Sequence, residues 1–481
     1  MSLRRLKISA RQSELAQLQA FQVGAALQAK YPDIKIEYSF RESLGDQNQN
    51  DPLWKMPEKG VFTEDFKTDL IENKTDFVVH SWKDLPTEKS EHTFIAATLP
   101  RADQRDLLLF KKSSRDKKNI IIFSSSPRRA HNLTPFLKWA LPFTIDDLQF
   151  QSVRGNMATR IRKWLENENV DGLIVAKAAI DRLICGPSEE TNQFLLKLMS
   201  DCLWMVAPLT ANPNAAAQGA LAIEINRSRT DLIEILDGIN CKDSFDAAQA
   251  ERELLKSYGG GCHLALGMSC LLRPYGKIQI IRGLTPNGER VESTQLISNK
   301  NLPTNTVRTR LKFSSNRQMH APILAEAYTA LYVSKVEAWN IQTPYSGLVW
   351  TSGLETWTKL AKQCVWVNGS HESLGENEPT RVENYFAAPL KWARLSHNQA
   401  SPGGDKAHLS GYSIDLKLES DKIPEAAAFV WMSPLEFDLA VQKFPQIKSS
   451  LHICGPGRTY EALKQRLGGD QNIYIEIPNY T

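Results

Sequence analysis

Short apolar segments alternate with longer segments of helical periodicity through the first half of the chain, and this alternation constrains the fold more than any other feature. "LRRLKISA" and "DFVVHSW" have the pattern of strands, and "SELAQLQAFQVGAALQAKY" between them carries apolar residues at helical spacing. "NIIIFSSSPRRAHNLTPFLKWA", "VDGLIVAKAAIDRL" and "GALAIEI" continue the series. This order predicts an α/β fold with mostly parallel sheets, whose ligands bind at the carboxyl ends of the strands.

The pattern changes after Arg227. A helical stretch, "SFDAAQAERELLKSYGGGC", leads to alternating strand patterns joined by an Asn-Gly turn, "KIQIIRGLTPNGERVESTQLIS", which predicts a small α+β domain. "NIQTPYSG" predicts a linker. Beyond it, "GLVWTSGLETWTKL" resembles "AFVWMSPLEFDLAVQKF", and "VWVNGSHESL" resembles "LHICGPGRTYEAL". Each of these four segments predicts a strand, a turn and a helix, so the tail carries a weak internal repeat.

Composition limits the class of protein. A chain of 481 residues with 42% hydrophobic content suggests about three packed domains. A net charge of +4 is too small to indicate a nucleic-acid-binding protein, and the seven scattered cysteines lack the spacing of a disulfide framework or a zinc site, so no metal is expected. No segment has the length and apolarity of a signal peptide or a membrane span, which predicts a cytoplasmic protein without membrane contact.

Basic residues recur in short loops beside hydroxyl groups or glycines. These loops are "RQS" at 11–13, "KMPEKG" at 55–60, "SSSPRR" at 124–129 and "RGNMATR" at 154–160. Guanidinium groups bind carboxylates in a bidentate way, and the free amides at a helix N-terminus favour an anion. Any single loop is better explained as a solvated surface patch. Together, at strand ends of one α/β region, they predict a cleft for a ligand that bears many carboxylates.

Two further motifs carry groups that could take part in chemistry. "HSWKDLP" places Lys83 and Asp84 directly after an apolar strand, where Asp84 either forms a turn or stabilises a cation and exchanges a proton with a reacting nitrogen. "SYGGGCHLALG" sets Cys262 behind three glycines, which permit backbone conformations closed to other residues and close approach of a large group. A thiol near several arginines is also more acidic and more nucleophilic than a free one.

Taken in order, these motifs resemble the hydroxymethylbilane synthase family, also called porphobilinogen deaminase. The resemblance runs from about residue 3 to about residue 300 and rests on "ARQS", "KG.F", "HSWKDLP", "SSSPRR", "RGN..TR", "QGALAIE" and "GGGC". It implies two α/β domains of the periplasmic-binding-protein type and a third that carries the cysteine. The domains expected are 1–100 with 203–226, 101–202, and 227–340. The implied reaction joins four porphobilinogen molecules stepwise, with loss of ammonia, into a linear tetrapyrrole.

The resemblance also implies roles for individual residues. Cys262 holds a dipyrromethane cofactor through a thioether, and Asp84 is the catalytic carboxylate that stabilises the azafulvene cation formed when the amino group leaves. The remaining cofactor-binding positions are Lys83, Ser125, Ser126, Arg128, Arg129 and Arg154. The substrate-binding positions are Arg11, Ser13, Lys55, Lys59, Ser81, Ser124, Arg160 and Arg182. The motifs depart from the family pattern in four places. Glu14 stands where the family usually has Pro, and Ala158 where it usually has Gly. "FSSS" replaces the common "GTSS", and "HLALG" follows the cysteine in place of the usual "QVPIG" type.

A protein of another class would share part of this pattern. Two α/β lobes around a basic cleft would also suit an anion-binding protein or sensor without catalysis. Such a receptor needs neither a carboxylate among the arginines nor a thiol behind three glycines, so Asp84 and Cys262 favour the enzyme.

The tail at 345–481 resembles the two halves of uroporphyrinogen-III synthase, a family that folds as two α/β lobes joined by a short ladder. The resemblance implies a compact cyclase that receives the linear tetrapyrrole directly, and the alternative is an appendage kept for stability or partner contact. Several polar or small residues fall where strand-end loops could meet carboxylates, although each is also explained as a turn or cap residue. These residues are Thr351, Ser352, Ser433, Gly455 and Thr459.

Overall fold

The computed structural model describes residues 4–42, 64–260, 264–322, 328–341, 345–400, 406–425 and 427–477. The chain divides into two compact units. The first comprises Met1–Pro135, Ile145–Leu272 and Ile280–Ser293, and the second Phe136–Thr144, Arg273–Gln279 and Thr294–Thr481. Among the helices within the described ranges, none is long and apolar enough to cross a membrane.

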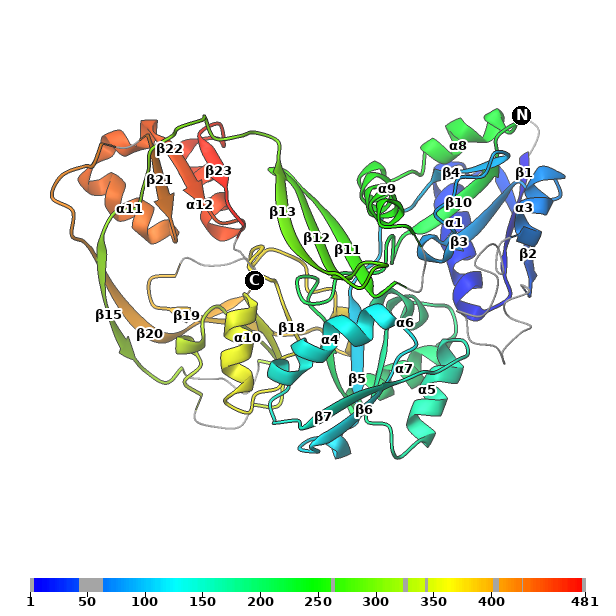
Figure 1. Cartoon of the computed structure of the whole chain (residues 1–481), viewed down its shortest axis with the longest axis horizontal. Coiled ribbons are helices and arrows are strands. Elements are labelled where there is room, and N and C mark those ends of the chain that lie inside the picture. The colour runs from blue at the N-terminus through cyan, green and yellow to red at the C-terminus, as the bar shows by residue number, and fades with distance from the viewer. Residues whose placement is uncertain are drawn as a thin grey trace. The chain divides into compact units, whose positions relative to one another are not determined.

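The first lobe of the first unit is built on a five-stranded sheet (Figure 1). Its strands, in sheet order, are β2 (Ile34–Arg41), β1 (Arg4–Arg11), β3 (Phe77–Ser81), β10 (Leu221–Asn226) and β4 (Thr93–Ala97). β1 is parallel to β2 and β3, whereas β10 is antiparallel to β3 and β4. The described helices of this lobe are α1 (Glu14–Lys30), α3 (Glu64–Ile71) and α8 (Ile233–Asp237). Ile8, Val23, Leu27 and Phe77 lie fully buried in its core.

The second lobe repeats this topology. Its strands, in sheet order, are β7 (Asp147–Gln151), β6 (Asn119–Phe123), β8 (Gly172–Ala176), β5 (Asp106–Phe110) and β9 (Leu203–Val206). β6 is parallel to β7 and β8, and β5 is antiparallel to β8 and β9. Its helices are α4 (Pro127–Ala140), α5 (Met157–Glu166), α6 (Lys177–Ile184) and α7 (Glu189–Asp201). The expected α/β fold is confirmed, with one antiparallel strand inserted in each sheet.

The structure moves one expected boundary in this unit. β9 pairs with β5, so the second lobe extends to Val206. The sequence pattern instead predicts that the whole of 203–226 belongs to the first domain. Of that range, β10 is the strand that joins the first sheet, because it pairs with β3 and β4.

The small α+β domain places a glycine loop directly after its helix. α9 (Lys242–Ser257) is followed by a three-stranded sheet in the order β11 (Leu266–Arg273), β12 (Gly276–Leu284) and β13 (Arg290–Ser298). After α9, Gly259 and Gly260 have φ angles of 90° and 67°. These left-handed conformations favour glycine, and a Cβ on Gly260 would lie 2.7 Å from Oγ1 of Thr87. The backbone freedom expected of "GGGC" is therefore used at two of its glycines.

The second unit contains two further sheets (Figure 1). One has the strand order β14 (Arg308–Thr309), β21 (Ala428–Trp431), β22 (Leu451–Cys454) and β23 (Ile473–Ile475), all parallel. The other has the order β15 (Phe313–Met319), β20 (Ala407–Leu418), β19 (Trp392–His397), β16 (Ala330–Val333), β17 (Leu348–Thr351) and β18 (Gly369–Ser370). β15 and β20 form an antiparallel ladder. The helices are α10 (Leu354–Ala361), α11 (Pro434–Lys443) and α12 (Arg458–Leu467).

These pairings correct the expected boundary near residue 340. β14 pairs with β21 and β16 pairs with β17, so the chain from Arg308 onward belongs to the C-terminal sheets. "NIQTPYSG" joins neighbouring strands of one sheet and is not a linker between domains. The predicted repeat holds for β17–α10, β21–α11 and β22–α12, but "VWVNGSHESL" forms only the short strand β18 and no helix follows it.

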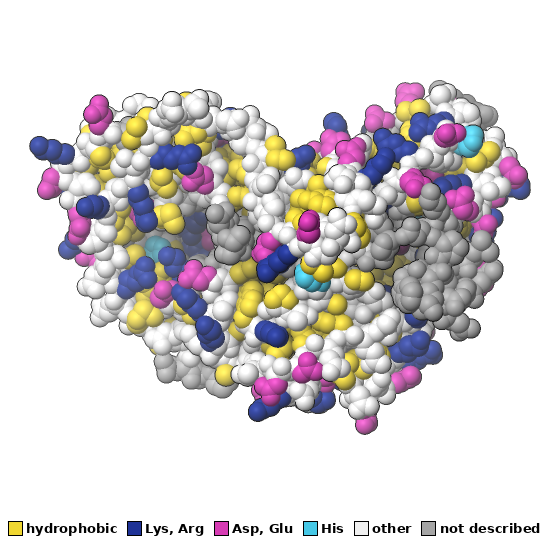
Figure 2. Space-filling view, in the orientation of Figure 1, with side chains coloured by type: hydrophobic (Ala, Val, Ile, Leu, Met, Phe, Trp, Pro, Cys, Tyr) yellow, Lys and Arg dark blue, Asp and Glu magenta, His cyan; other side chains and the backbone are white. Residues whose placement is uncertain are grey.

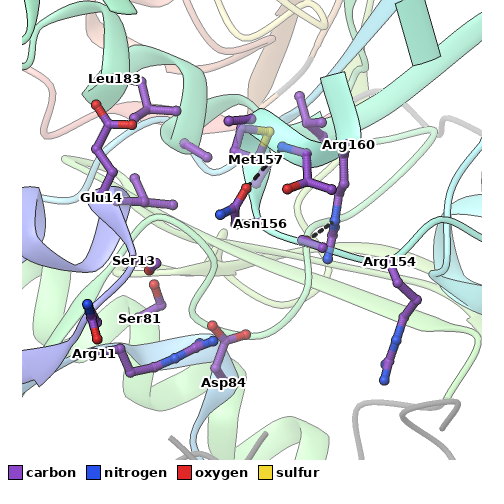
Figure 3. A pocket seen from close by; sticks show the side chains of 18 of the residues that line it. Arg11, Ser13, Glu14, Ser81, Asp84, Arg154, Asn156, Met157, Arg160 and Leu183 are labelled. Carbon is purple, nitrogen blue, oxygen red and sulfur yellow. Dashed lines mark hydrogen bonds between the residues drawn. The ribbon is translucent and has the colours of Figure 1, made fainter. Parts of the chain in front are cut away.

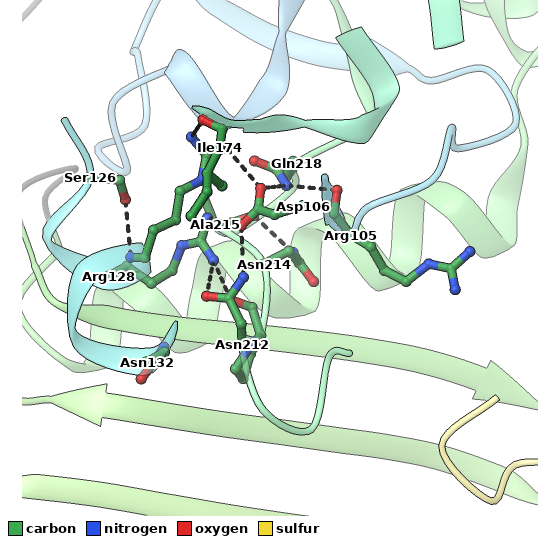
Figure 4. A network of polar contacts seen from close by, with 12 residues as sticks. Arg105, Asp106, Ser126, Arg128, Asn132, Ile174, Asn212, Asn214, Ala215 and Gln218 are labelled. Carbon is green, nitrogen blue, oxygen red and sulfur yellow. Dashed lines mark hydrogen bonds and ion pairs between the residues drawn. The ribbon is translucent and has the colours of Figure 1, made fainter. Parts of the chain in front are cut away.

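A buried carboxylate, that of Asp106, connects side chains from several segments where the chain passes between the two N-terminal lobes (Figure 4). Asp106, at the start of β5, is 1% exposed. Its Oδ2 lies 2.8 Å from Nη2 of Arg128, and its Oδ1 lies 2.7 Å from Nη2 of Arg129. Asn212 and Gln218 donate further hydrogen bonds to the same carboxylate, at 2.8 and 2.9 Å. Asp106 therefore joins the start of α4 to the segment that leads back to β10.

The same network reaches the first lobe through Gln218. The Oε1 atom of Gln218 accepts a hydrogen bond from Nζ of Lys83 at 3.2 Å, while its Nε2 donates to Asp106. Burial by itself would raise the pKa of Asp106, but the charges of Arg128 and Arg129 outweigh it and hold the pKa well below its usual range. The carboxylate is thus ionised and fixes the position of two arginines and, through Gln218, of Lys83.

We expect Asp106→Asn to destabilise the protein strongly, because the change leaves two buried guanidinium groups without their counter-charge. Breaking a buried ion pair in this way costs about 3–5 kcal/mol. Urea denaturation followed by circular dichroism measures the loss. Asp146→Asn is the control, since Asp146 is exposed and lies 3.9 Å from Lys118, and it should change stability by less than about 0.5 kcal/mol.

The pH dependence of the same pair of proteins provides a second measurement. A carboxyl whose pKa is lowered by folding adds stability above its unfolded pKa of about 3.9, and this stability is lost as the pH falls through the folded value. The stability gap between the wild type and Asp106→Asn should therefore be full at neutral pH and shrink below about pH 4. A gap that stayed constant with pH would contradict an ionised Asp106.

Candidate functional site

A cavity of about 540 Å³ in the first unit brings together many of the expected site residues. Those that line it are Arg11, Ser13, Ser81, Lys83, Asp84, Arg129, Arg154 and Arg160. They come from both N-terminal lobes, and Figure 3 shows several of them directed into one space. The carboxyl ends of β1, β3 and β8 contribute to this lining, as expected for an α/β protein.

The first lobe contributes the end of β1 and the start of α1. Arg11 is the last residue of β1, and Ser13 is the N-cap of α1, with extended backbone angles. The oxygen of Ser13 is not used in a side-chain capping bond, so the first turn of α1 keeps amides available for an anion. Arg11 and Ser13 also border a smaller cavity of about 90 Å³ that shares Asp84 with the main one.

Asp84 is held at the cavity by a buried anchor. It ends a single 3₁₀ turn, Trp82–Asp84, that directly follows β3. Trp82 and Leu85 on either side are buried in one apolar cluster, and the backbone NH of Trp82 donates to the oxygen of Ala220 at 3.0 Å. These contacts leave the Asp84 side chain exposed in the cavity, with Arg11 extending toward it (Figure 3).

The second lobe contributes the start of α5. Gly155 has φ of 117°, a conformation that favours glycine, and a Cβ there would lie 2.6 Å from the Thr159 side chain. Asn156 caps the helix by accepting from the backbone NH of Thr159 at 3.0 Å. Nε of Arg160 donates to the oxygen of Gly155 at 2.7 Å, which fixes this guanidinium at the cavity wall.

Positive charge dominates the cavity wall. Burial lowers the pKa of Lys83, and the nearby Asp84 carboxylate partly offsets this effect. Burial and then the charge of Arg129 lower the pKa of Arg160, again with Asp84 acting in the opposite direction. Crowded cations of this kind favour an anionic ligand, because its charge relieves their mutual repulsion.

Arg129 is the lining residue with the clearest open donor. Its Nη2 is paired with Asp106 and its Nη1 donates to the oxygen of Ile174 at 3.2 Å. Its Nε is buried and has no hydrogen-bond partner among the described residues. Arg129 is therefore a residue of the cavity wall with one donor that no described residue uses.

Several expected site residues lie elsewhere in the first unit. Arg128 is 3% exposed, and it donates to Asn212 at 3.0 Å and to the oxygen of Pro213 at 2.7 Å in addition to its pair with Asp106. Arg182 is buried, donates to the oxygen of Gly219 at 2.8 Å, and has its pKa lowered to about 10 by burial. Neither residue lines the cavity. The structure therefore gives both of them contacts with protein groups where the resemblance implied ligand contacts.

The serines of "SSSPRR" hold the loop before α4. Ser125 donates to the oxygen of Val153 at 2.7 Å and accepts from its NH at 2.9 Å. Ser126 accepts from the NH of Arg129, and Ser124 accepts from the NH of Ser126. None of the three serines lines the cavity, and in the structure their hydroxyls shape the backbone. Lys55, Lys59 and Cys262 lie outside the described residues.

The sequence analysis missed other residues of this site. Asn156 and Thr159 lie inside a recognised motif, and the Asn-x-x-Thr spacing before a helix is the signal that could have identified the cap. Glu14 and Glu42 also line the cavity. Asp106 belongs to no recognised motif, and its only signal is a charged residue at the start of the apolar run "DLLLF".

Comparison with known proteins identifies a family that matches the N-terminal part of the chain. Residues 6–234 match the family model described as porphobilinogen deaminase, dipyromethane cofactor binding domain. A porphobilinogen deaminase from Syntrophomonas wolfei is 36% identical over 285 residues, which are 59% of this chain and 85% of that protein. Those from Clostridium novyi and Nostoc sp. are 35% and 34% identical, over 55% of this chain and 83% and 77% of theirs.

The matched relatives are covered over most of their length, and the matched region contains both lobes that form the cavity. It also contains Asp84 and the basic loops on which the resemblance rests. The region beyond it includes the C-terminal sheets. On these grounds, the chain belongs to the porphobilinogen deaminase family.

Proposed function

We propose that the cavity of the first unit binds porphobilinogen and the growing chain, and that Asp84 is the carboxylate that makes their condensation possible. The observation that carries this proposal is the position of Asp84. Its side chain is exposed in a cavity whose wall carries Arg11, Lys83, Arg129, Arg154 and Arg160. A carboxylate in this position weakens the binding of an acidic substrate, so binding alone does not explain it. It is explained if it stabilises a positive charge that forms on the substrate during the reaction.

The cations have the complementary task. Arg129 lines the cavity and has an Nε that no described residue uses as a donor, and the guanidinium of Arg160 is fixed by its bond to Gly155. The first turns of α1 and α5 add backbone amides that favour carboxylates. Because each added unit brings two more carboxylates, several moderate contacts that can be exchanged serve better than one tight site.

The described residues fit a dipyrromethane group. The cationic wall, which includes Arg129 with its unused Nε, suits the carboxylates of such a group, and the left-handed glycines 259 and 260 lie just before Cys262. When bound, the cofactor supplies the carbon to which the first unit is added. Lys83 would support it from the first lobe, where Gln218 holds its ammonium.

Asp84 then acts by electrostatics. Loss of ammonia leaves a positive charge on the pyrrole of the substrate, and a preorganised carboxylate lowers the free energy of that cation. The buried anchors Trp82 and Leu85 keep the carboxylate in place without reorganisation during the reaction. Arg11 and Lys83 limit where the substrate carboxylates lie and so direct the ring toward Asp84.

Covalent attachment can be tested by intact mass. Purified protein should carry the mass of two pyrroles and, after addition of porphobilinogen, a ladder of further units. Cys262→Ser should fold but lack both the adduct and activity. Cys270 is buried on β11 and cannot readily replace it, so an adduct retained by the variant would contradict Cys262 as the anchor.

Asp84→Asn tests the charge at constant shape. Loss of a preorganised electrostatic partner lowers turnover by about 10² or more, while the thermal unfolding temperature should stay close to that of the wild type. Glu14→Gln is the matched control, because Glu14 is a carboxylate of the same cavity at a position where the family usually has Pro. Equal effects of the two changes on porphobilinogen consumption would show that Asp84 has no special role.

We also propose a second activity for the second unit, the ring closure that gives uroporphyrinogen III from the linear product. The support is its architecture, since two mostly parallel sheets are linked by the antiparallel ladder of β15 and β20. This is the arrangement of lobes that the resemblance of the tail implies. The linear product would then pass from the first unit to the second within one chain.

Isomer analysis tests this second activity. Since β14 begins at Arg308, a chain that ends at Lys300 lacks the C-terminal sheets and keeps β13. Supplied with porphobilinogen and then oxidised, the full chain should yield type III uroporphyrin and the shortened chain type I. Type I from both would leave the deaminase proposal intact and reject the cyclase.

A further inference from the structure

A buried cluster of charges in the second unit lies outside the deaminase site. Arg394 on β19 is 1% exposed, and its Nη1 lies 2.9 and 3.1 Å from the two carboxylate oxygens of Glu376. Nη1 of Arg458, the first residue of α12, lies 3.2 Å from the same carboxylate. Glu376 is therefore shared by guanidinium groups from two different sheets of this unit.

The two sheets approach each other closely at this point. Gly375 precedes Glu376 and Gly457 precedes Arg458, and both have positive φ angles, 128° and 84°. A Cβ on Gly457 would lie 2.3 Å from the Cα of Gly375. Only glycine permits this approach, which places the carboxylate between the two arginines.

Neighbouring groups show that the local charge is positive. Burial first, and then the charges of Arg458, Lys335, His408 and Arg394, lower the pKa of His397 to about 4. Burial and then Arg394 lower the pKa of His408 as well. Burial and the nearby cations therefore both disfavour the charged form of these imidazoles, and an anion placed among the groups would relieve the repulsion between the cations.

Two polar atoms of the cluster have unused hydrogen-bonding capacity. Nδ1 of His397 and Nε2 of His408 are buried and have no hydrogen-bond partner among the described residues. His397 ends β19 and His408 lies near the start of β20. Buried polar atoms in this state destabilise a protein unless a ligand or water satisfies them.

The cluster lies where α/β proteins bind ligands. β19 is parallel to β16 in one sheet, and β22 is parallel to β21 in the other. The cluster includes His397 at the carboxyl end of β19 and Arg458, which follows the loop from β22 to α12. α12 is a ten-residue helix whose N-terminal amides face this loop and favour an anion. Figure 2 shows basic side chains and a histidine in a hollow of this unit, between the positions of β19 and α12 in Figure 1.

We propose that Arg394, Arg458 and the two histidines form a second anion site, specific for a polycarboxylate, in which Glu376 occupies the carboxylate position when no ligand is bound. Nη1 of Arg394 already contacts both oxygens of a carboxylate, that of Glu376, so the position that a ligand carboxylate would take is defined. The site goes beyond the deaminase activity and requires no ring closure. Its ligand is either the linear tetrapyrrole or an unrelated polycarboxylate.

Hydrogen exchange with mass spectrometry on the full chain tests the site, since it separates this region from the deaminase cavity. Benzenehexacarboxylate and uroporphyrin I are the two probes, and inorganic phosphate is the comparison. Peptides covering 392–400 and 455–462 should gain protection with at least one carboxylate probe. Protection by both indicates a general polycarboxylate site, and protection by uroporphyrin alone indicates a tetrapyrrole site. No protection by either probe, or equal protection by phosphate, overturns the proposal.

Three variants assign the effect to the cluster. Arg458→Gln should raise the probe concentration needed for half-maximal protection by about tenfold or more, because a charge-assisted hydrogen bond to the probe is lost. Glu376→Gln should lower that concentration by about tenfold, because the carboxylate that competes with the probe for the arginines is removed. Arg466→Gln is the matched control on α12, since Arg466 pairs with Asp438 outside the cluster, and it should leave binding unchanged.

The two opposite shifts keep the test decisive if one variant folds poorly. Porphobilinogen consumption should stay at the wild-type level in all three variants, because their side chains belong to the second unit. If Arg458→Gln and Arg466→Gln weakened probe binding by the same factor, the effect would come from the overall positive charge and not from the cluster. That result would overturn the proposal. Unchanged or weaker binding in a folded Glu376→Gln would overturn the role of Glu376 as the internal occupant.

Discussion

The ionised carboxylate of Asp106 is the contact on which the N-terminal site depends. It neutralises two adjacent buried arginines and, through Gln218, sets the position of Lys83 in the other lobe. Without its charge, Arg128 and Arg129 could not remain buried beside each other. The cationic wall of the cavity is therefore stabilised by a buried carboxylate that does not itself line the cavity.

The two adjacent arginines of "SSSPRR" therefore have different roles. Arg128 has both of its Nη atoms bonded to protein groups and does not line the cavity, while Arg129 lines the cavity and has an unused Nε donor among the described residues. The serines before them bond the backbone of their own loop and of the loop that follows β7. In such a cluster of polar residues at a strand end, some side chains line the cavity and others hold the backbone and the lining side chains in position.

Sequence reasoning predicted the α/β lobes and most of the cavity, because strand ends and helix starts of one sheet meet at the same edge. It could not separate Arg128 from Arg129, since adjacent arginines differ only in the direction in which the fold turns them. It also missed the C-terminal boundary. β14 and β16 are short strands whose partners, β21 and β19, follow much later in the chain, and such distant pairing leaves no local pattern.

The antiparallel strand in each N-terminal sheet has a consequence for synthesis of the protein. β5 to β9 lie in one continuous stretch, so the second lobe has its whole sheet once Val206 has been made. The first lobe must wait for β10, which enters between β3 and β4 only after the second lobe has left the ribosome. Because domains fold as their chains emerge, the lobe that is made first is the last of the two to close, and its unfinished sheet edge is exposed throughout that interval.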